Sequence, residues 1–162
     1  AVELCKKTNQ FNFRTSRHNE KNLIEICKNN NDFCFLSSLS DIYGDHGLVN
    51  LVCLSEFDKD FVFIETFLMS CRVLGRSLES WTLNEIKKIA IKNKFQYLIG
   101  QYIHSDKNII VKDFYKEHNF SNLNKNSKLF QNISKYLNGD NYYYIKLDDL
   151  KINGLEIYEW KN

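Results

Sequence analysis

The sequence lacks the features of several broad protein classes. No apolar run approaches the length of about eighteen residues that a membrane-spanning helix requires, and no signal-peptide pattern opens the chain. The formal net charge is only +2, which is too small to suggest binding to nucleic acid or to an anionic membrane. We therefore expect neither a membrane nor a nucleic acid among the partners of this chain.

The cysteine and histidine residues show no pattern of paired ligands. The five cysteines are odd in number and include no C-x-x-C pair, which argues against a disulfide framework and suits a reducing, cytoplasmic location. Cys34 and Cys53 lie in apolar, strand-like runs, so we expect both to be buried. His104 and His118 have no ligand spacing with cysteines or acidic residues, and we predict no metal site.

The chain has the size and composition of one globular domain. It has 162 residues, of which 43% are hydrophobic and 14% aromatic. Residue patterns predict the order β-α-β-β-β-α-β-α-β, an α/β (α+β) arrangement with a mixed, mostly antiparallel sheet flanked by helices. The expected strands cover residues 11–15, 33–39, 48–57, 61–69, 97–103 and 142–147. The expected helices cover residues 19–28, 78–92, 108–117 and, as a short element, 129–137.

Other segments are predicted from single residues and local composition. Asn19 is expected to cap the first helix. Residues 40–47 are expected to form a turn-rich link, and residues 58–60 a hairpin turn. We expect residues 1–10 to be a tail or an interdomain linker, and residues 154–160 to be another strand or a tail.

The most informative stretch is the junction between the expected strand at 61–69 and the expected helix at 78–92. The loop from Arg72 to Ser77 reads R-x-x-G-x-S. Backbone N–H groups at a helix start lack partners within the helix, and the positive end of the helix dipole lies there, so both favour an anion. Gly75 would let the backbone approach such an anion closely. We expect the amides of residues 74–77 to face one concavity, although such junctions also arise through packing alone.

This loop resembles the Q/R-x-x-G-x-G/A loop of GNAT-type acyltransferases, which binds the pyrophosphate of acyl-coenzyme A or of a phosphopantetheine carrier. Residues 107–120 resemble a second GNAT signature, N-x-x-A-x-x-L-Y-x-x-x-G-F, which Asn108 and Tyr115 match directly. Asn119 replaces its glycine and suits a left-handed helix end. The resemblance implies a GNAT-like fold whose thioester contacts are Leu68, Met69, Arg72, Leu74, Gly75, Arg76, Ser77 and Asn108.

A narrower resemblance covers much of the chain. The matching segments are similar to parts of the FkbH-like family and lie at residues 6–15, 43–49, 65–76 and 97–120. The chain departs from that family at Glu65, where Asp is usual, and at Ser77, where Gly is usual. The resemblance implies an acyl carrier protein as partner and a glyceryl or related acyl group.

The same resemblance suggests how the chain is organised. Residues 11–162 would form the GNAT-like domain, cut from a longer protein that carries an upstream HAD-like domain. The only methionine is Met69, so Ala1 is not an intact translation start. This agrees with the expectation of a domain cut from a longer protein, although removal of the initiator would also explain it.

Two residues are the main candidates for acid–base chemistry in acyl transfer, which needs a base for the nucleophile and an acid for the departing thiolate. The resemblance places Tyr115 at the thioester sulfur as the acid, and the alternative is packing beside Phe114 and Phe120. Glu65 lies near the end of an apolar strand and could serve as a base in an apolar setting. Its alternative role is that of a structural carboxylate bonded to the backbone.

Three further residues are weaker catalytic candidates. Cys71 lies at the edge of the loop, where a helix N-terminus could acidify its thiol, or it is simply a packed residue. Asp45 and His46 are flanked by glycines and could orient a substrate or stabilise a turn. The sequence thus predicts an acyltransferase domain, and a non-catalytic module that docks a carrier protein remains the alternative.

Overall fold

The structure is a computed structural model that describes residues 2–8, 10–15, 19–29 and 32–152. These ranges contain α-helices, 3-10 helices (η) and strands. In chain order they are α1 (Val2–Lys7), β1 (Phe11–Asn12), α2 (Glu20–Lys28), β2 (Asp32–Asp41), β3 (Gly44–Asp58), β4 (Phe61–Met69), η1 (Cys71–Val73), α3 (Leu78–Lys92), β5 (Tyr97–Gln101), η2 (Ile109–Val111), α4 (Phe114–Glu117), β6 (Ser121–Asn122), α5 (Lys128–Ile133), η3 (Ser134–Tyr136) and β7 (Tyr142–Lys146).

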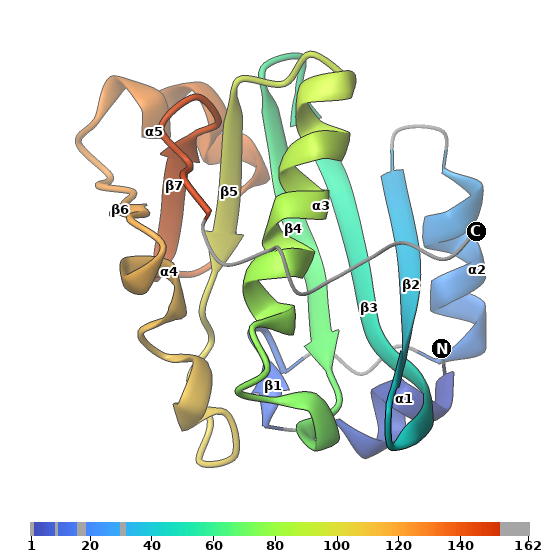
Figure 1. Cartoon of the computed structure of the whole chain (residues 1–162). Helices are drawn as coiled ribbons and strands as arrows, with labels where there is room; N and C mark the ends of the chain where they lie inside the picture. The colour runs from blue at the N-terminus through green and yellow to red at the C-terminus, as the bar shows by residue number, and fades with distance from the viewer. Residues whose placement is uncertain (1, 9, 16–18, 30–31, 153–162) are drawn as a thin grey trace.

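A mixed sheet forms the centre of the molecule (Figure 1). Its strands follow the order β2-β3-β4-β5-β7-β6, and β1 pairs with β4 away from this path. Every neighbouring pair is antiparallel except β4 and β5, which are parallel because α3 connects them. This is the mixed, mostly antiparallel sheet flanked by helices that the sequence predicts.

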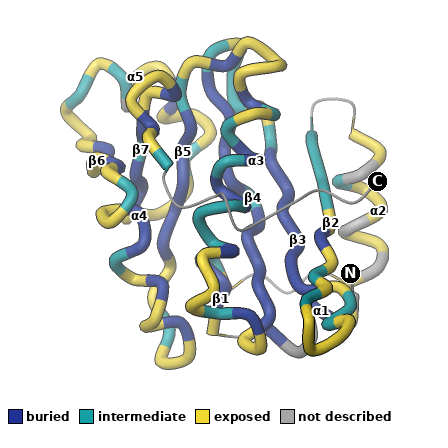
Figure 2. The backbone as a smooth tube through the Cα atoms, viewed as in Figure 1, coloured by how far each residue is buried: buried dark blue, intermediate teal, exposed yellow. Residues whose placement is uncertain are grey.

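Helix α3 covers one face of the sheet. Leu83, Ile86 and Ala90 of this helix are fully buried and belong to the same core cluster as Val52 of β3 and Leu98 of β5. Their spacing is the helical periodicity that predicted the element. The central strands under α3 are buried along most of their length (Figure 2).

The opposite face carries two smaller clusters. Leu51 and Val52 are consecutive in β3, so they point to opposite faces of the sheet. Leu51 packs with Leu4 of α1 and Leu68 of β4 in one cluster. The other cluster joins Phe63 of β4 to the region of α5. The middle of β4 lies between the two clusters. None of the described helices is long and apolar enough to cross a membrane.

Several local predictions are confirmed. The Asn19 side chain accepts a hydrogen bond from the Asn22 amide at 2.9 Å, as a helix N-cap does. Asn119 has φ +61°, the left-handed conformation expected at a helix end. The turn between β3 and β4 lies where the sequence predicts it. Cys53 is fully buried, whereas Cys34 is only half-buried, so the prediction for Cys34 is wrong.

The expected link at residues 40–47 is wrong. Strands β2 and β3 run through this segment and meet in a tight turn at Ile42 and Tyr43. The turn is stabilised by the Tyr43 amide, which donates to Asp41 Oδ1 at 2.8 Å. Ile42 is 91% exposed, so the side chains at this end of the hairpin are little buried on either face of the sheet. The apolar alternation that identifies a half-buried strand is therefore missing from it.

Other predicted bounds also change. The helix expected at residues 108–117 is divided into η2 and α4, and the short helix expected at 129–137 into α5 and η3. The strand expected at 97–103 ends at Gln101, and the two-residue strand β6 was not expected. Helix α1 forms within the segment expected to be a tail or linker. Residues 154–160 lie outside the described residues.

Candidate functional site

Strands β4 and β5 separate in the middle of the sheet. They pair only over residues 61–63 of β4 and 97–99 of β5. Directly afterwards β4 contains a β-bulge, because Ile64 and Thr66 pair with consecutive residues of β3 and leave Glu65 as the extra residue. Beyond this point β4 does not pair with β5, and we call this part of the sheet the notch.

The segment Phe11–Arg14, called the inserted segment below, borders β4 in the notch. Phe11 and Asn12 form β1, which pairs with Met69 and Leu68 of β4 (Figure 1). The same two residues of β4 also pair with β3 on their other side. A thioester that used this edge of β4, as the sequence predicts, would therefore have to displace β1.

The inserted segment is also bonded to the chain that follows β5. The Ile103 amide donates to the Phe13 carbonyl oxygen at 2.8 Å. Asn108 Nδ2 donates to the Asn12 carbonyl oxygen at 2.8 Å. Asn108 itself is fully buried, so it acts here as an internal brace. The predicted contact of Asn108 with a thioester would have to coexist with this bracing role.

Aromatic packing makes the inserted segment part of the core. Phe11 and Phe13 are 4% and 1% exposed. Their ring centroids lie 5.2 and 5.3 Å from that of Phe67, and that of Phe13 lies 5.0 Å from Phe114. Burying a phenylalanine side chain contributes about 1.5–3 kcal/mol, so removing both rings from the notch would cost several kcal/mol. The segment is thus a stable wall of the site.

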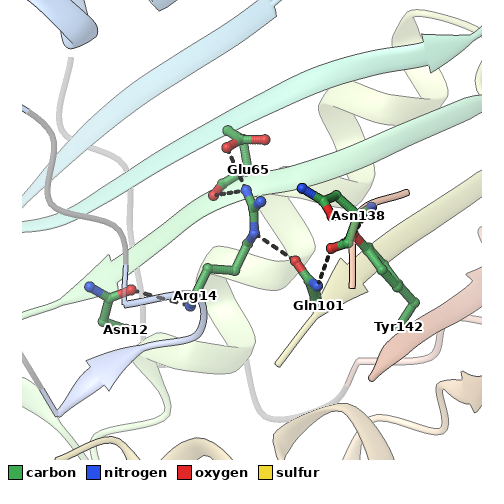
Figure 3. A network of polar contacts seen from close by, with 6 residues as sticks. All are labelled: Asn12, Arg14, Glu65, Gln101, Asn138 and Tyr142. Carbon is green, nitrogen blue, oxygen red and sulfur yellow. Dashed lines mark hydrogen bonds and ion pairs between the residues drawn. The ribbon is translucent and has the colours of Figure 1, made fainter. Parts of the chain in front are cut away.

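Arg14 ends the inserted segment and links both sides of the notch (Figure 3). Its Nη1 donates to the Glu65 carbonyl oxygen at 3.1 Å and to the carboxylate oxygen Oε1 of the same residue. Its Nε donates to Gln101 Oε1 at 3.0 Å. The side chains of Arg14 and Glu65 are 21% and 29% exposed, so the network is partly open to solvent.

Glu65 lies on the bulge of β4, partly exposed at the notch. Its carboxylate is held by the guanidinium of Arg14 rather than by backbone N–H groups. Among the described residues, no backbone N–H group is bonded to this carboxylate, so the structural alternative that the sequence left open is not observed in this part of the chain. Glu65 remains a candidate base on the bulge of β4.

Tyr115 is a core residue in this structure. Its side chain is fully buried, with ring centroids 5.1 Å from those of Phe13, Phe120 and Tyr143. Within the described residues its hydroxyl oxygen has no partner at good hydrogen-bond geometry. Burial raises the pKa of its phenol and outweighs the opposing effects of Arg14 and of the nearby Gln101 backbone. The ring lies against Gly100 of β5, where an added Cβ atom would come within 2.4 Å of it. The structure favours the packing role over the predicted acid.

The loop after β4 has an open glycine. Gly75 has φ +74°, and a Cβ atom built there meets nothing within 4 Å. Its amide donates to the carboxylate of Glu79 at 2.9 Å, so an oxygen anion already lies at this amide. The Leu74 amide instead bonds to the Cys71 carbonyl oxygen in the 3-10 turn. The four amides predicted to face one concavity therefore do not act together, because one of them closes η1.

The remaining loop residues have mixed environments. Arg72 donates through Nε to Ser70 Oγ at 3.2 Å, and Ser77 adopts φ +60° directly before α3. Cys71 is exposed and lines a cavity of about 500 Å³ at the end of β4. The other lining residues are Thr8, Gln10, Phe11, Met69, Asp106 and Lys107. An exposed thiol in a polar cavity keeps the predicted reactive role of Cys71 open.

The β2–β3 hairpin meets the loop through Asp41. Its Oδ2 accepts hydrogen bonds from Arg76 Nη1 at 2.7 Å and from His46 Nε2 at 2.9 Å. The His46 contact is the main reason that the pKa of Asp41 lies below its ordinary value, followed by the Tyr43 amide. Asp45 accepts a bond from the Gly47 amide at 2.7 Å, as in a turn.

The predicted catalytic residues thus do not form one constellation. Glu65 lies at the notch, Tyr115 in the core and Cys71 at the end of β4, while Asp45 and His46 lie on the hairpin. Within the described residues, no group of three or more His, Cys, Asp or Glu side chains is placed to hold a metal ion.

Arg14 and Gln101 are site residues that sequence reasoning missed. Each is a polar residue at the end of a short apolar stretch, FNFR and YLIGQ. A polar side chain at the end of a buried strand is a signal that could have identified Gln101. The partner of Arg14 is 51 residues away, so no local pattern indicates it.

Comparison with known proteins supports the fold. No protein-family model matches the sequence, and no curated protein matches it. Among solved structures, Rv2747 from Mycobacterium tuberculosis in complex with CoA matches with TM-score 0.63 and 12% identity, over 90% of both chains. A GNAT-family acetyltransferase from Staphylococcus aureus matches with TM-score 0.61 and 16% identity, over 78% of this chain and 75% of its own.

A third solved structure is N-acetylglutamate synthase from Neisseria gonorrhoeae, complexed with coenzyme A and N-acetyl-glutamate. It matches with TM-score 0.58 and 13% identity, over 80% of this chain and 28% of its own. At such identities the likeness establishes the arrangement of the chain and not its substrates. Together with the parallel β4–β5 pair and the loop before α3, these matches show that the chain has the GNAT fold.

Proposed function

We propose that the chain is an acyltransferase domain that accepts a thioester of coenzyme A or of phosphopantetheine. One observation carries this proposal. Strand β4 presents the Glu65 carboxylate on a bulge at the notch, and the chain then continues into an open glycine loop before α3. Two of the structurally similar proteins were solved with coenzyme A. This likeness supports a thioester as the substrate class.

Within this proposal the loop holds the phosphate groups and Glu65 serves as the base for the acceptor. The Glu79 carboxylate at the Gly75 amide would give way to a phosphate oxygen, a stronger multivalent anion. Arg72 and Arg76 supply positive charge at the same loop. Tyr115 could act as the acid only if the packing around its ring, to which Phe13 of the inserted segment contributes, opened to the substrate.

The finer assignment follows the FkbH-like resemblance of the sequence. The thioester would then be carried by an acyl carrier protein, and the transferred group would be a glyceryl or related acyl unit. An upstream HAD-like domain in a longer chain would supply that group. A cytoplasmic location agrees with this chemistry.

A second function is favoured by the closed notch. The inserted segment occupies the edge of β4 that a thioester arm would use, and Tyr115 is buried beneath it. A domain that binds the phosphopantetheine end of a carrier protein without reacting would need the loop and not the notch. Binding of a thioester without turnover would indicate this docking role.

The decisive experiment measures coenzyme A binding by calorimetry, followed by hydrolysis of acetyl-coenzyme A, in which water accepts the acetyl group and the coenzyme A thiol is released. We expect wild-type binding and its loss in Gly75→Val, because a branched side chain at φ +74° blocks the anion and strains the turn. Gly47→Val is the matched control: its φ of +65° is close to that of Gly75 and its surroundings are equally open, but it lies in β3. Equal affinity in Gly75→Val and wild type would overturn the loop assignment.

A further inference from the structure

Arg14 is held in place from several sides before any ligand binds. Its own segment is fixed by strand pairing to β4 and by hydrogen bonds to the carbonyl groups of Asn12 and Phe13. The guanidinium carbon lies 4.8 Å from the centroid of the Phe63 ring, within range of a cation–π contact. The chain therefore presents the guanidinium at the notch in one orientation.

Gln101 fixes the other side of the network (Figure 3). Its Nε2 donates to the carbonyl oxygens of Asn138 at 3.2 Å and Asp140 at 3.1 Å. These two bonds leave Oε1 of the same amide pointing to Arg14 Nε, at 3.0 Å. The loop before β7 thereby sets the direction of the Gln101 amide, and the amide sets the direction of the guanidinium.

The Glu65 carboxylate is the partly exposed end of this chain of contacts. Glu65 belongs to a bulge, where the strand ladder gives it no partner in β3. Among the described residues, Arg14 is the side chain that holds this carboxylate. A planar guanidinium can bond one neighbour through Nε and another through Nη1 at fixed angles, which a lysine ammonium cannot reproduce.

We propose that Arg14 is a positioning residue of the acyl-transfer site, which orients the Glu65 carboxylate at the notch through a guanidinium anchored by Gln101. This inference rests on the proposed function and adds a residue to it. The alternative is that Arg14 only ties the inserted segment to β4 and β5. A substitution of Arg14 would lower turnover if Arg14 positions Glu65. It would lower stability alone if Arg14 only ties the segment to the strands.

The test measures hydrolysis of acetyl-coenzyme A, in which water accepts the acetyl group and acetate and free coenzyme A are released. The proteins compared are wild type, Arg14→Lys, Arg14→Gln, Glu65→Gln and the double variant Arg14→Gln/Glu65→Gln. We expect Arg14→Gln and Glu65→Gln each to lower kcat by about 10- to 100-fold with KM changed less than about threefold. The double variant should be no slower than the slower single variant, because the two residues act as a unit. Arg14→Lys should retain only part of the activity.

Two controls separate positioning from folding. Lys92→Gln removes a positive charge from the exposed end of α3 and should behave as wild type. Thermal unfolding is followed for each variant, and methylguanidine is added to Arg14→Ala, where partial recovery of kcat would support the positioning role. The positioning role is overturned if Arg14→Gln is as active as wild type, or if the two single losses multiply in the double variant. The proposed function would survive either result. A wild-type protein that releases no coenzyme A overturns the proposed function and this role with it.

Discussion

The loop at Arg72–Ser77 and the notch between β4 and β5 are adjacent along β4, yet they differ in what surrounds them. The space around Gly75 is open, and the amide there is bonded to an exposed carboxylate that a ligand could replace. The notch is filled by aromatic side chains and by a segment bonded on both sides. The part of the site suited to hold an anion is thus accessible, although its amides already have partners, whereas the part suited to chemistry is closed except at Arg14 and Glu65.

The largest effect is expected where the notch is tightest. In Gly100→Ala, the new Cβ atom would lie 2.4 Å from three atoms of the Tyr115 side chain, which is fully buried and cannot move aside. Overpacking of this kind costs about 1–3 kcal/mol, and we expect the upper end of that range. Urea unfolding of the purified protein measures the loss.

The same substitution in the open loop provides the comparison for Gly100→Ala. Gly75→Ala creates only backbone strain at φ +74°, with no atom within 4 Å of the new Cβ, and should cost about 1 kcal/mol. Combining Gly100→Ala with Tyr115→Ala should cost less than the sum of the two single losses, because the atoms that clash are gone. Equal losses for Gly100→Ala and Gly75→Ala would contradict the contrast between a closed notch and an open loop.

A smaller effect is expected from Tyr115→Phe. The substitution removes a buried hydroxyl that has no partner among the described residues, so it should stabilise the protein by about 1 kcal/mol. Coenzyme A affinity and turnover should stay within about threefold of wild type if the notch remains closed during the reaction. Chemical unfolding and the coenzyme A release assay on one preparation test both statements.

Turnover is the informative result for Tyr115→Phe. A fall of roughly 10²–10⁴ at unchanged affinity is the loss expected for a positioned acid. It would mean that the inserted segment leaves the notch during the reaction and that the acid role predicted from the sequence is correct. The closed arrangement would then be a resting state of the site.

The loop was predictable because its signal is local. Residues 61–92 contain the end of a strand, a glycine and the start of a helix. The residue pattern indicates each of these three features. The buried stripe of α3 and the cap at Asn19 were predictable for the same reason. These features depend on neighbours within one or two turns of the chain.

The notch was not predictable in the same way. The alternation in FNFR indicates a strand, but nothing local indicates that Phe11 pairs with Met69 of β4. Likewise, the motif identifies Tyr115, whereas its burial depends on Phe13 and Gly100, which come from other elements. Contacts between distant segments decide whether a motif residue faces solvent or the core.

The smallest effect is expected at the contact between the open loop and the β2–β3 hairpin, where Arg76 and His46 both meet Asp41. The pKa of Asp41 is lowered in the folded protein, mainly by the His46 hydrogen bond. A carboxyl group with a depressed folded-state pKa adds stability above its unfolded pKa, for which the ordinary value is 3.8. That contribution is lost as the pH falls from this value through the lower folded-state pKa.

Asp41→Asn should therefore bring the thermal stability of the variant closer to that of wild type as the pH falls from 5 toward 2. The difference at neutral pH should be slight and should shrink further in high salt, because the Arg76–Asp41 ion pair is partly exposed and screened. Melting curves of wild type and Asp41→Asn across this pH range, at two salt concentrations, measure it. A stability difference that persists unchanged at pH 2 would mean that Asp41 acts through packing of the turn. The loop would then be held by the shape of the hairpin and not by its charge.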